Sequence, residues 1–501
     1  MALSVLAVAL GGIAVLFLSS SAPSPSASGG HRLADSPYPN VDRSNTRHLA
    51  SSIDSDSVSS LAVDWTLPIM AQGNFYGAYY ASPTIVDGVV YSQDQSSDVQ
   101  AIDLETGAVL WEKSWREPIV GPNGVVVARG RVYGATQRRT FALDAKTGEE
   151  VWSTELLRSR SMQISMAPGY RRGTVYVSTA PAPPFAGGEA GVLWALDGRT
   201  GKKKWHFDTV PRDLWGNRAI NYGGGLNYTP AFDDDGSMYF SVGIAGPIPG
   251  TEKFPWGSSR PGPNRYTSSV VKLDAKTGDL RWFHQVIPHG ICNWNLGPPV
   301  LFRGGGRDLV IVAGRSGVVV ALDRRTGEPV WRRPVGTHNG HDNDGLLAIR
   351  GEESTLKTPM TVYPGRFGGV AAPVSVSGST IFVPVVNMAT RIDSQTTGED
   401  VGSGSGELVA LDAVTGSPRW KKQFSSPLYG ATTSTNDLVF AATFDGGLHA
   451  LDSGSGEVIW EASLPAGSDT GLALSGNTLL VPAGYAQKGQ VAQLVAYRLQ
   501  D

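Results

Sequence analysis

The chain contains 501 residues and carries a formal net charge of −3, with 42 Lys and Arg residues against 45 Asp and Glu residues. This near balance argues against nucleic acid and against an anionic membrane surface as electrostatic partners. The single cysteine, Cys292, excludes an intrachain disulfide, whereas 62 glycines and 32 prolines are typical of a chain rich in turns.

The amino-terminal segment, residues 1–28, combines an apolar run over residues 2–18 with a Ser-, Pro- and Ala-rich stretch. This order predicts a secretory signal peptide followed by a flexible spacer. An uncleaved membrane anchor is the alternative, because about 17 apolar residues are at the lower limit of a span. Either reading predicts a protein that is secreted or anchored to the outer face of the cell membrane, with membrane contact only through this segment. We expect residues 29–60 to form an extended approach to the first strand.

One sequence pattern recurs along the rest of the chain. An alternating apolar run ends in Ala-Leu-Asp or a close variant, a Thr-Gly turn follows, and a Trp comes four residues after the Gly, as in Ala321-Leu-Asp-Arg-Arg-Thr-Gly-Glu-Pro-Val-Trp331. The pattern predicts a β-hairpin in which Asp starts the turn, Gly takes a positive φ and Trp lies on the returning strand. The seven complete copies end at Trp111, Trp152, Trp205, Trp282, Trp331, Trp420 and Trp460.

An eighth copy is divided between the chain ends. Residues 494–497 have the pattern of the strand before the turn, and residues 61–65 have that of the strand after it. A unit of several short strands repeating about every 40 to 50 residues indicates the blades of a propeller. Pairing of the two ends would remove two exposed sheet edges. We therefore predict an all-β, eight-bladed β-propeller of four-stranded antiparallel blades over residues 61–501, closed by the N- and C-terminal strands. The repeat Trps, Trp65 included, are interpreted as packing residues.

Functional loops are expected on one face of such a propeller, just after each repeat Trp and just before each Ala-Leu-Asp strand. Two long insertions, around residues 246–264 and 387–406, are expected to wall the same mouth. The unusual stretches predicted to ring it are residues 74–80, 121–124, 213–218, 289–295 and 338–345.

The Ala-Leu-Asp-x-x-Thr-Gly-x-x-x-Trp repeat resembles the tryptophan-docking repeat of quinoprotein alcohol dehydrogenases and of their non-enzymatic relatives, including the bacterial outer-membrane assembly propeller. The resemblance covers nearly all of the chain after about residue 38. For the enzymes it implies pyrroloquinoline quinone (PQQ) on the axis, a calcium ion, an Asp base, an Arg near the quinone oxygens and a Trp stacked on the ring. It places Arg315 at the Arg position and Tyr228, in Gly223-Gly-Gly-Leu-Asn-Tyr228, at the aromatic position. Relatives without a cofactor share the repeat, so it indicates fold more strongly than chemistry.

The chain departs from the resemblance where chemistry is expected. The catalytic segment, with Asp on both sides of a Trp, corresponds to Cys292-Asn-Trp-Asn295, so the amides of Asn293 and Asn295 or the Cys292 thiol replace the carboxylates. An amide cannot act as a base near neutral pH. Ile244 stands at the position of the calcium-binding Asn, and an apolar side chain cannot bind a hard cation. Residues 121–124 replace the adjacent cysteine pair, and Ala371-Ala372 replaces an Asn-Trp pair. Glu189 is a weak candidate for the metal-binding carboxylate.

The densest polar cluster contains His338, His341, Asp342 and Asp344. Imidazole and carboxylate groups between glycines are consistent with a metal or substrate site, with Asp342 and Asp344 as weak metal candidates. The alternative is a hydrogen-bonded, turn-rich loop. Arg315 likewise either binds an anionic ligand or clamps loop carbonyls. For Cys292 we expect a buried, inert thiol rather than a nucleophile.

These observations predict an exported propeller that binds a small molecule or an envelope protein through a mouth lined by Tyr228, Asn293, Asn295, Arg315 and His338, with a degraded quinone and calcium site. The alternative is an active PQQ-dependent alcohol or sugar dehydrogenase in which Asp342, Asp344 or Glu189 supplies the carboxylate. A third hypothesis is an envelope scaffold. The catalytic residues, the cofactor (PQQ with calcium, or none) and the oligomeric state stay open.

Overall fold

The computed structural model describes residues 35–71, 73, 77–292, 294–393, 395–398 and 403–500. The predicted signal peptide or anchor over residues 1–28 and the candidate site residue Asn293 lie outside this description. Among the described residues, no helix has both the length and the apolar character that crossing a membrane requires. The fold that follows is that of the unit Leu33–Asp501.

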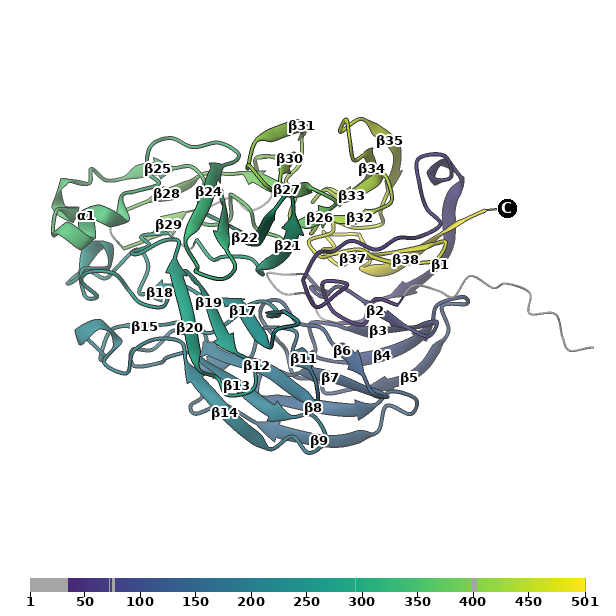
Figure 1. Cartoon of the computed structure of the whole chain (residues 1–501), viewed down its shortest axis with the longest axis horizontal. Coiled ribbons are helices and arrows are strands. Elements are labelled where there is room, and N and C mark those ends of the chain that lie inside the picture. The colour runs from purple at the N-terminus through teal and green to yellow at the C-terminus, as the bar shows by residue number, and fades with distance from the viewer. Residues whose placement is uncertain are drawn as a thin grey trace, which may run out of the picture. The chain divides into compact units, whose positions relative to one another are not determined.

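Short antiparallel strands build the fold, and within the described residues eight sheets contain a path of four strands. In Figure 1 the first three lie side by side in chain order. The first sheet holds β2 (Thr84–Val86), β3 (Val89–Gln93), β4 (Val99–Asp103) and β5 (Val109–Lys113). The second holds β6 (Val126–Ala128), β7 (Arg131–Ala135), β8 (Arg139–Asp144) and β9 (Glu150–Glu155). The third holds β11 (Gly169–Arg171), β12 (Thr174–Pro181), β13 (Val192–Asp197) and β14 (Lys203–Asp208), with β10 (Met162–Gln163) also pairing β12.

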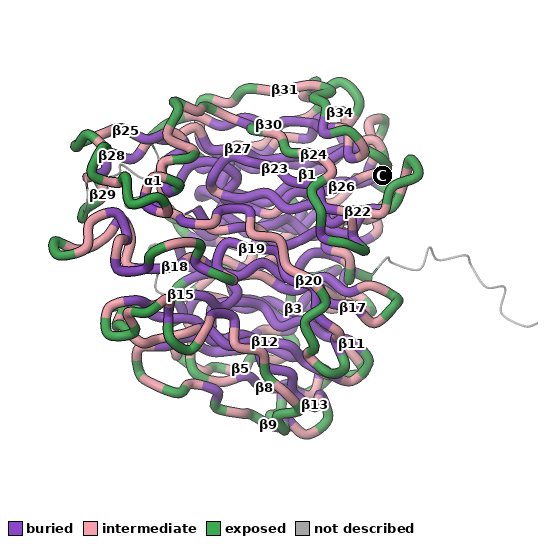
Figure 2. Tube along the Cα trace, turned by 60° about the vertical axis from the view of Figure 1, so that its left-hand side comes forward, coloured by how far each residue is buried: buried purple, intermediate pink, exposed green. Residues whose placement is uncertain are grey.

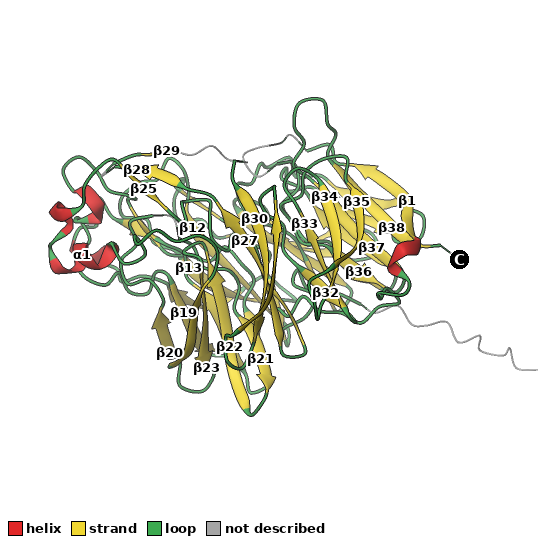
Figure 3. Ribbon diagram, turned by 90° about the horizontal axis from the view of Figure 1, so that it is seen from above, coloured by secondary structure: helices red, strands yellow, loops and turns green. Residues whose placement is uncertain are grey.

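The next four sheets repeat this order, and inserted strands interrupt two of them, those of β16 and β26. They are β16 (Ala231–Phe232), β17 (Ser237–Ser241), β19 (Ser269–Asp274) and β20 (Leu280–Gln285); β21 (Val300–Gly304), β22 (Arg307–Gly314), β23 (Val318–Asp323) and β24 (Pro329–Pro334); β26 (Ser375–Ser377), β27 (Thr380–Asn387), β30 (Ser405–Asp412) and β31 (Pro418–Phe424); and β32 (Thr433–Thr435), β33 (Leu438–Ala442), β34 (Gly447–Asp452) and β35 (Val458–Ser463). The insertions form β15 (Tyr222–Gly223) with β18 (Ala245–Gly246), and β25 (Met360–Val362), β28 (Thr390–Ile392) and β29 (Thr397–Gly398). Figure 3 shows the short helix α1 (Gly345–Arg350) on the same side as β25 and β28.

Burial follows the position of a strand in its sheet. The third strands are buried on both faces, as in β13, whereas the outermost strands alternate between exposed and half-buried residues, as in β31. Figure 2 shows buried residues along the strands and exposed residues at the turns. Strands that are covered on both faces read as continuous apolar runs, which explains why the Val-, Leu- and Ala-rich segments precede each repeat Asp.

The repeat Trp residues join neighbouring sheets. The Trp65 ring packs on Gly107 in the turn of the next sheet, where φ is 71° and an added Cβ would lie 2.7 Å from the ring. Only Gly suits both conditions, because a side chain there would be strained and would collide with the indole. The indole NH also donates to the Leu104 carbonyl at 3.0 Å. Equivalent indole-to-carbonyl hydrogen bonds come from Trp111, Trp152, Trp282, Trp331 and Trp420.

The two ends of the repeat region pair with each other, as the sequence predicts. β1 (Leu61–Pro68) pairs antiparallel with β38 (Gln493–Leu499), and the sheet continues through β37 (Thr478–Ala483) and β36 (Ala473–Ser475). Trp65 lies opposite Ala496, which matches the pairing of Trp111 with Ala101 in the first sheet. Trp460 packs edge-on against Tyr497 with 5.6 Å between ring centroids, so β35 also contacts this sheet.

Residues 36–48 run past the first strands of six sheets and hydrogen-bond to each of them. The donors are the backbone NH groups of Ile85, Val127, Phe232, Leu301, Val376 and Ser434, and the acceptors are the carbonyls of Ser36, Pro37, Arg43, Ser44, Thr46 and Arg47. Arg47 is fully buried, and its guanidinium donates to the carbonyls of Thr432, Pro39 and Leu472 and to the side chains of Asn40, Ser82 and Thr433. The approach segment therefore ties sheets together that are far apart in sequence.

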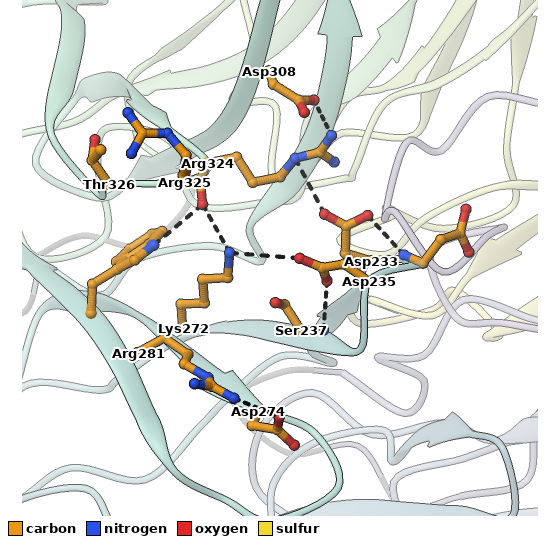
Figure 4. A network of polar contacts seen from close by, with 12 residues as sticks. Asp233, Asp235, Ser237, Lys272, Asp274, Arg281, Asp308, Arg324, Arg325 and Thr326 are labelled. Carbon is orange, nitrogen blue, oxygen red and sulfur yellow. Dashed lines mark hydrogen bonds and ion pairs between the residues drawn. The ribbon is translucent and has the colours of Figure 1, made fainter.

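A partly buried ionic network joins the sheets of β17 and β22, as Figure 4 shows. Arg324 contacts Asp308 and lies 3.3 Å from Asp233. Lys272, which replaces the usual Ala of the repeat, donates to the Arg324 carbonyl at 3.1 Å, and the Trp282 indole NH donates to the same carbonyl at 3.2 Å. Burial lowers the pKa of Lys272, an effect that nearby Asp235 and Asp233 oppose.

Candidate functional site

A cavity with a volume of about 490 Å³ opens among the described residues. Its wall combines loops from several sheets with both predicted insertions. Gly121 and Pro122 follow β5, Asn295 precedes β21, and Ile248 and Thr397 belong to the two insertions. Convergent loops and a volume of several hundred Å³ are typical of small-molecule sites.

Aromatic rings and one cation give this cavity its chemical character. Phe185 and Tyr222 stack with ring centroids 5.1 Å apart and an interplanar angle of 4°. The Arg366 guanidinium lies over the Phe367 ring at 5.1 Å and donates to Thr397 Oγ1 at 3.1 Å. All five side chains line the cavity. Flat apolar surfaces beside a guanidinium suit a planar ligand that carries an anionic group.

Tyr222 is close enough to Arg366 to respond to its charge. Burial raises the pKa of Tyr222, whereas the positive charges of Arg260 and Arg366 lower it. Gly246 faces the Tyr222 ring so closely that an added Cβ would lie 2.2 Å from it. The insertion strands β15 and β18 therefore hold this aromatic ring against the cavity.

Arg315 contacts two residues of the cavity wall, Arg366 and Phe367. Its Nη1 donates to the Arg366 carbonyl at 3.2 Å, and its guanidinium lies 5.5 Å from the centre of the Phe367 ring. Of the two roles considered for Arg315, the clamping of a loop carbonyl is therefore present. Sequence reasoning missed Arg366 itself, although it lies in the Gly-rich segment Pro364-Gly-Arg-Phe-Gly-Gly369, a composition that signals a loop.

Asn295 lines the cavity and accepts a hydrogen bond through Oδ1 from the Ile244 backbone NH at 3.3 Å. Its carbonyl accepts from the Arg315 backbone NH at 2.9 Å. The described lining residues include neither Asp nor Glu. Within the described part of the chain there is also no group of three or more His, Cys, Asp or Glu side chains placed to hold a metal. These residues suit the anionic, planar part of PQQ but do not suit calcium, which prefers several carboxylate and carbonyl oxygens.

Glu189, the weak candidate for a metal-binding carboxylate, accepts a hydrogen bond from Ser159 Oγ at 2.6 Å. It is not among the residues that line the cavity. Its backbone carbonyl instead accepts from the Gly223 NH at 3.1 Å, next to the cavity wall.

The His and Asp cluster forms two separate pairs. His338 Nδ1 lies 2.6 Å from Asp342 Oδ1, and its Nε2 lies 3.1 Å from the Val335 carbonyl oxygen. His341 Nδ1 lies 2.7 Å from Asp344 Oδ2. None of the four lines the cavity, and the segment leads directly into α1. These contacts are those of a hydrogen-bonded loop.

Tyr228 lines a second, smaller cavity of about 50 Å³ and donates through its hydroxyl to the Ala371 carbonyl at 3.3 Å. Pro122 and Asn227 line both cavities, so the two are adjacent. Cys292 is fully buried, as expected for an inert thiol. The predicted mouth residues are thus divided: Asn295 faces the larger cavity, Tyr228 the smaller one, and Arg315 supports the wall.

Comparison with known proteins agrees with this architecture. The family model described as outer membrane protein assembly factor BamB matches residues 95–224 and 369–501. A second model, described as the β-propeller domain of glucose, ethanol and alcohol dehydrogenases, matches residues 234–339.

Individual relatives cover most of the chain. The quinohemoprotein alcohol dehydrogenase of Comamonas testosteroni is 27% identical over 90% of this chain and 71% of its own length. Subunit 1 of a cytochrome c-linked methanol dehydrogenase from Methylobacterium organophilum is 25% identical over 86% of this chain and 80% of its own. The crystal structure of the Comamonas enzyme superimposes with a TM-score of 0.79 at 24% identity, covering 93% of this chain and 80% of that one. A europium-containing methanol dehydrogenase superimposes with a TM-score of 0.76 at 19% identity, covering 93% and 98%. The chain therefore belongs to the PQQ-repeat β-propeller family, whose members include quinoprotein alcohol dehydrogenases.

Proposed function

We propose that this chain is a closed, eight-bladed propeller that binds a planar, anionic small molecule in the cavity beside Arg366. The observation that carries the proposal is the position of the Arg366 guanidinium, which lines the cavity together with stacked Phe185 and Tyr222. A guanidinium binds carboxylates in a two-pronged geometry, and aromatic faces bind a flat ring system. The closed ring of eight blades is supported by the pairing of β1 with β38.

We further propose that the dehydrogenase chemistry of the family has been lost from this cavity. Asn295 stands where the resemblance implies a catalytic Asp, and its amide oxygen already accepts a hydrogen bond from the Ile244 NH. An amide cannot take up a proton at neutral pH, so no base faces the cavity from this position. Ile244 offers only an apolar side chain at the position that the resemblance assigns to a calcium ligand.

The second candidate function is an active, quinone-dependent alcohol dehydrogenase. It is favoured by the similarity to quinohemoprotein alcohol dehydrogenase along 90% of this chain. A carboxylate from Glu189, Asp342 or Asp344 would then have to reach the cavity. Each of these groups would first have to give up its present partner, which is Ser159, His338 or His341 respectively.

Reconstitution distinguishes the two functions. Purified protein is mixed with PQQ in the presence of calcium or of a chelator, and both bound-quinone absorbance and alcohol-dependent dye reduction are measured. Our proposal predicts binding that survives chelation and no dye reduction. Turnover that requires calcium and disappears in Asp342→Asn, Asp344→Asn or Glu189→Gln would establish the dehydrogenase instead.

Extracytoplasmic placement is also proposed, on the basis of the apolar run over residues 2–18 and of a family model named for an outer membrane assembly factor. The same model description supports the third hypothesis, an envelope scaffold. Cell fractionation followed by mass measurement of the mature protein tests the placement. Recovery of the full-length chain only in the cytoplasm would refute it.

A further inference from the structure

The smaller cavity, of about 50 Å³, contains a carboxyl group that neither the fold nor the proposed function explains. Asp469 lines this cavity and is only 7% exposed. Its Oδ1 has no hydrogen-bond partner among the described residues. Burial of an ionised carboxylate without a partner is strongly unfavourable, so a buried carboxyl group is normally paired or protonated.

The charged and titratable groups around Asp469 do not neutralise it. Arg47 is not among the described residues that line the cavity, and its guanidinium donates to the hydroxyl of Ser82, to the side-chain oxygen of Asn40 and to other neutral acceptors. The Tyr80 and Tyr228 phenols line the cavity, and Tyr485 lies close enough for Asp469 to raise its pKa, after burial as the main cause. Burial raises the pKa of Asp469 well above its usual range, and only its own backbone NH opposes this effect.

Oxygen-bearing side chains also make up much of the cavity wall. They come from the approach segment and from the segments that follow β1, β5, β15 and β35, and they are Asn40, Tyr80, Ser82, Asn123, Asn227, Tyr228, Thr229 and Thr470. The volume exceeds the roughly 10 to 15 Å³ that one water molecule requires, so an ion together with one or two waters can be accommodated. A carboxylate with neutral oxygens is the ligand set of a hard cation.

We propose that this cavity is a binding site for a monovalent alkali cation, Na⁺ or K⁺, with the Asp469 carboxylate as its charged ligand. Charge balance favours a monovalent ion, because one carboxylate cancels one positive charge and a divalent ion would leave a buried excess. The site joins segments from four sheets, so a bound ion stabilises the folded propeller over the unfolded chain. The inference does not depend on ligand binding in the larger cavity.

The test is cation-dependent stability at pH 8. The melting temperature of the full-length protein is measured in NaCl, KCl, LiCl and choline chloride at equal ionic strength. We expect a saturable rise of about 2 to 5 °C in one of the alkali salts relative to choline chloride. Equilibrium dialysis of the wild-type protein against radioactive sodium, and against rubidium as a potassium probe, is expected to give one bound ion per chain.

Matched variants assign the effect to this site. Asp469→Asn keeps the shape of the side chain and is expected to abolish both the selective rise and the bound ion, whereas Asp56→Asn, at an exposed position, should change neither. Equal melting temperatures in all salts together with no bound ion would overturn the proposal and indicate a protonated Asp469. A response that persists in Asp469→Asn would also overturn it. If Asp469→Asn does not fold, the wild-type dialysis decides.

Discussion

Trp65 lies directly opposite Ala496 in the antiparallel pair of β1 and β38, in the same register as the Trp and Ala of the complete repeats. The sheet that unites the two ends of the chain is thus built by the same hairpin geometry as the others, but without a covalent turn between its last two strands. Its stability rests on strand pairing and on the contact of the Trp65 ring with Gly107.

Trp65→Ala tests the importance of this contact. The half-buried indole loses its packing on the next turn and its hydrogen bond to the Leu104 carbonyl, so we expect the free energy of unfolding to fall by about 2 to 4 kcal/mol. Chemical denaturation measures the change. Trp331→Ala, in a complete repeat, should cost a similar amount. A large loss in Trp331→Ala with none in Trp65→Ala would contradict a structural role for the paired ends.

Arg47→Met tests how much the approach segment contributes to the stability of the fold. Burial lowers the pKa of Arg47 to about 10, so the guanidinium is charged at neutral pH and its donors serve six neutral acceptors. Methionine fills similar space but leaves those acceptors unpaired, and we expect a loss of at least about 3 kcal/mol in unfolding free energy. Arg43→Met, at a half-exposed side chain, is the matched control. Equal stabilities of the two variants would show that the Arg47 contacts are unimportant.

The carboxylate of Asp412, in a repeat turn, is expected to make the stability of the fold depend on pH. Hydrogen bonding from Arg419 lowers the pKa of Asp412 to about 2, below the value of 3.8 expected for a free side chain. The stabilisation is therefore complete above about pH 4 and is lost as the pH falls through about 2. Melting temperatures between these limits should fall less steeply in Asp412→Asn than in the wild type. Asp234→Asn, with a 90% exposed side chain, should follow the wild-type curve. Identical slopes for all three proteins would show that Asp412 does not contribute to the pH dependence of stability.

Asn295→Asp probes the sign of the charge that the larger cavity accepts. A carboxylate at this position would repel an anionic ligand, and we expect affinity for PQQ to fall roughly tenfold, whereas Asn295→Ser should have a smaller effect. Fluorescence titration measures both. Tighter binding in Asn295→Asp, dependent on calcium, would mean that the cavity is arranged for a cation and would contradict our interpretation.

The repeat made much of the fold predictable from sequence. Each hairpin needs Asp, Gly and Trp at fixed spacing, because the turn needs an acceptor and a positive φ and the next sheet needs an aromatic contact. The same pattern, divided between the two chain ends, predicted that residues 61–65 pair with residues 494–497, and β1 does pair with β38. Loops carry no such period, so the convergence of Asn295, Ile248 and Thr397 on one cavity depends on the lengths of individual insertions.

The side chains that line the two cavities were harder to predict, because they lie in loops that carry no repeat period. Arg366 and Asp469 lie in loops outside the repeated hairpin pattern, and ordinary surface loops also contain Arg and Asp. Their significance comes from the cavities that they line and, for Asp469, from burial, which only the three-dimensional arrangement supplies. The His338 cluster shows the opposite case, in which a dense polar segment forms local pairs away from the cavity.

Isothermal titration calorimetry of PQQ into the wild-type protein, Arg366→Gln and Arg391→Gln, all in chelator, tests the central claim most directly. Arg366 lines the cavity, whereas Arg391 is exposed elsewhere on β28. We predict one site in the wild type, affinity reduced at least about tenfold in Arg366→Gln and unchanged affinity in Arg391→Gln. No binding to the wild type, or equal binding by Arg366→Gln, would contradict the proposal that this propeller holds an anionic, planar ligand beside Arg366.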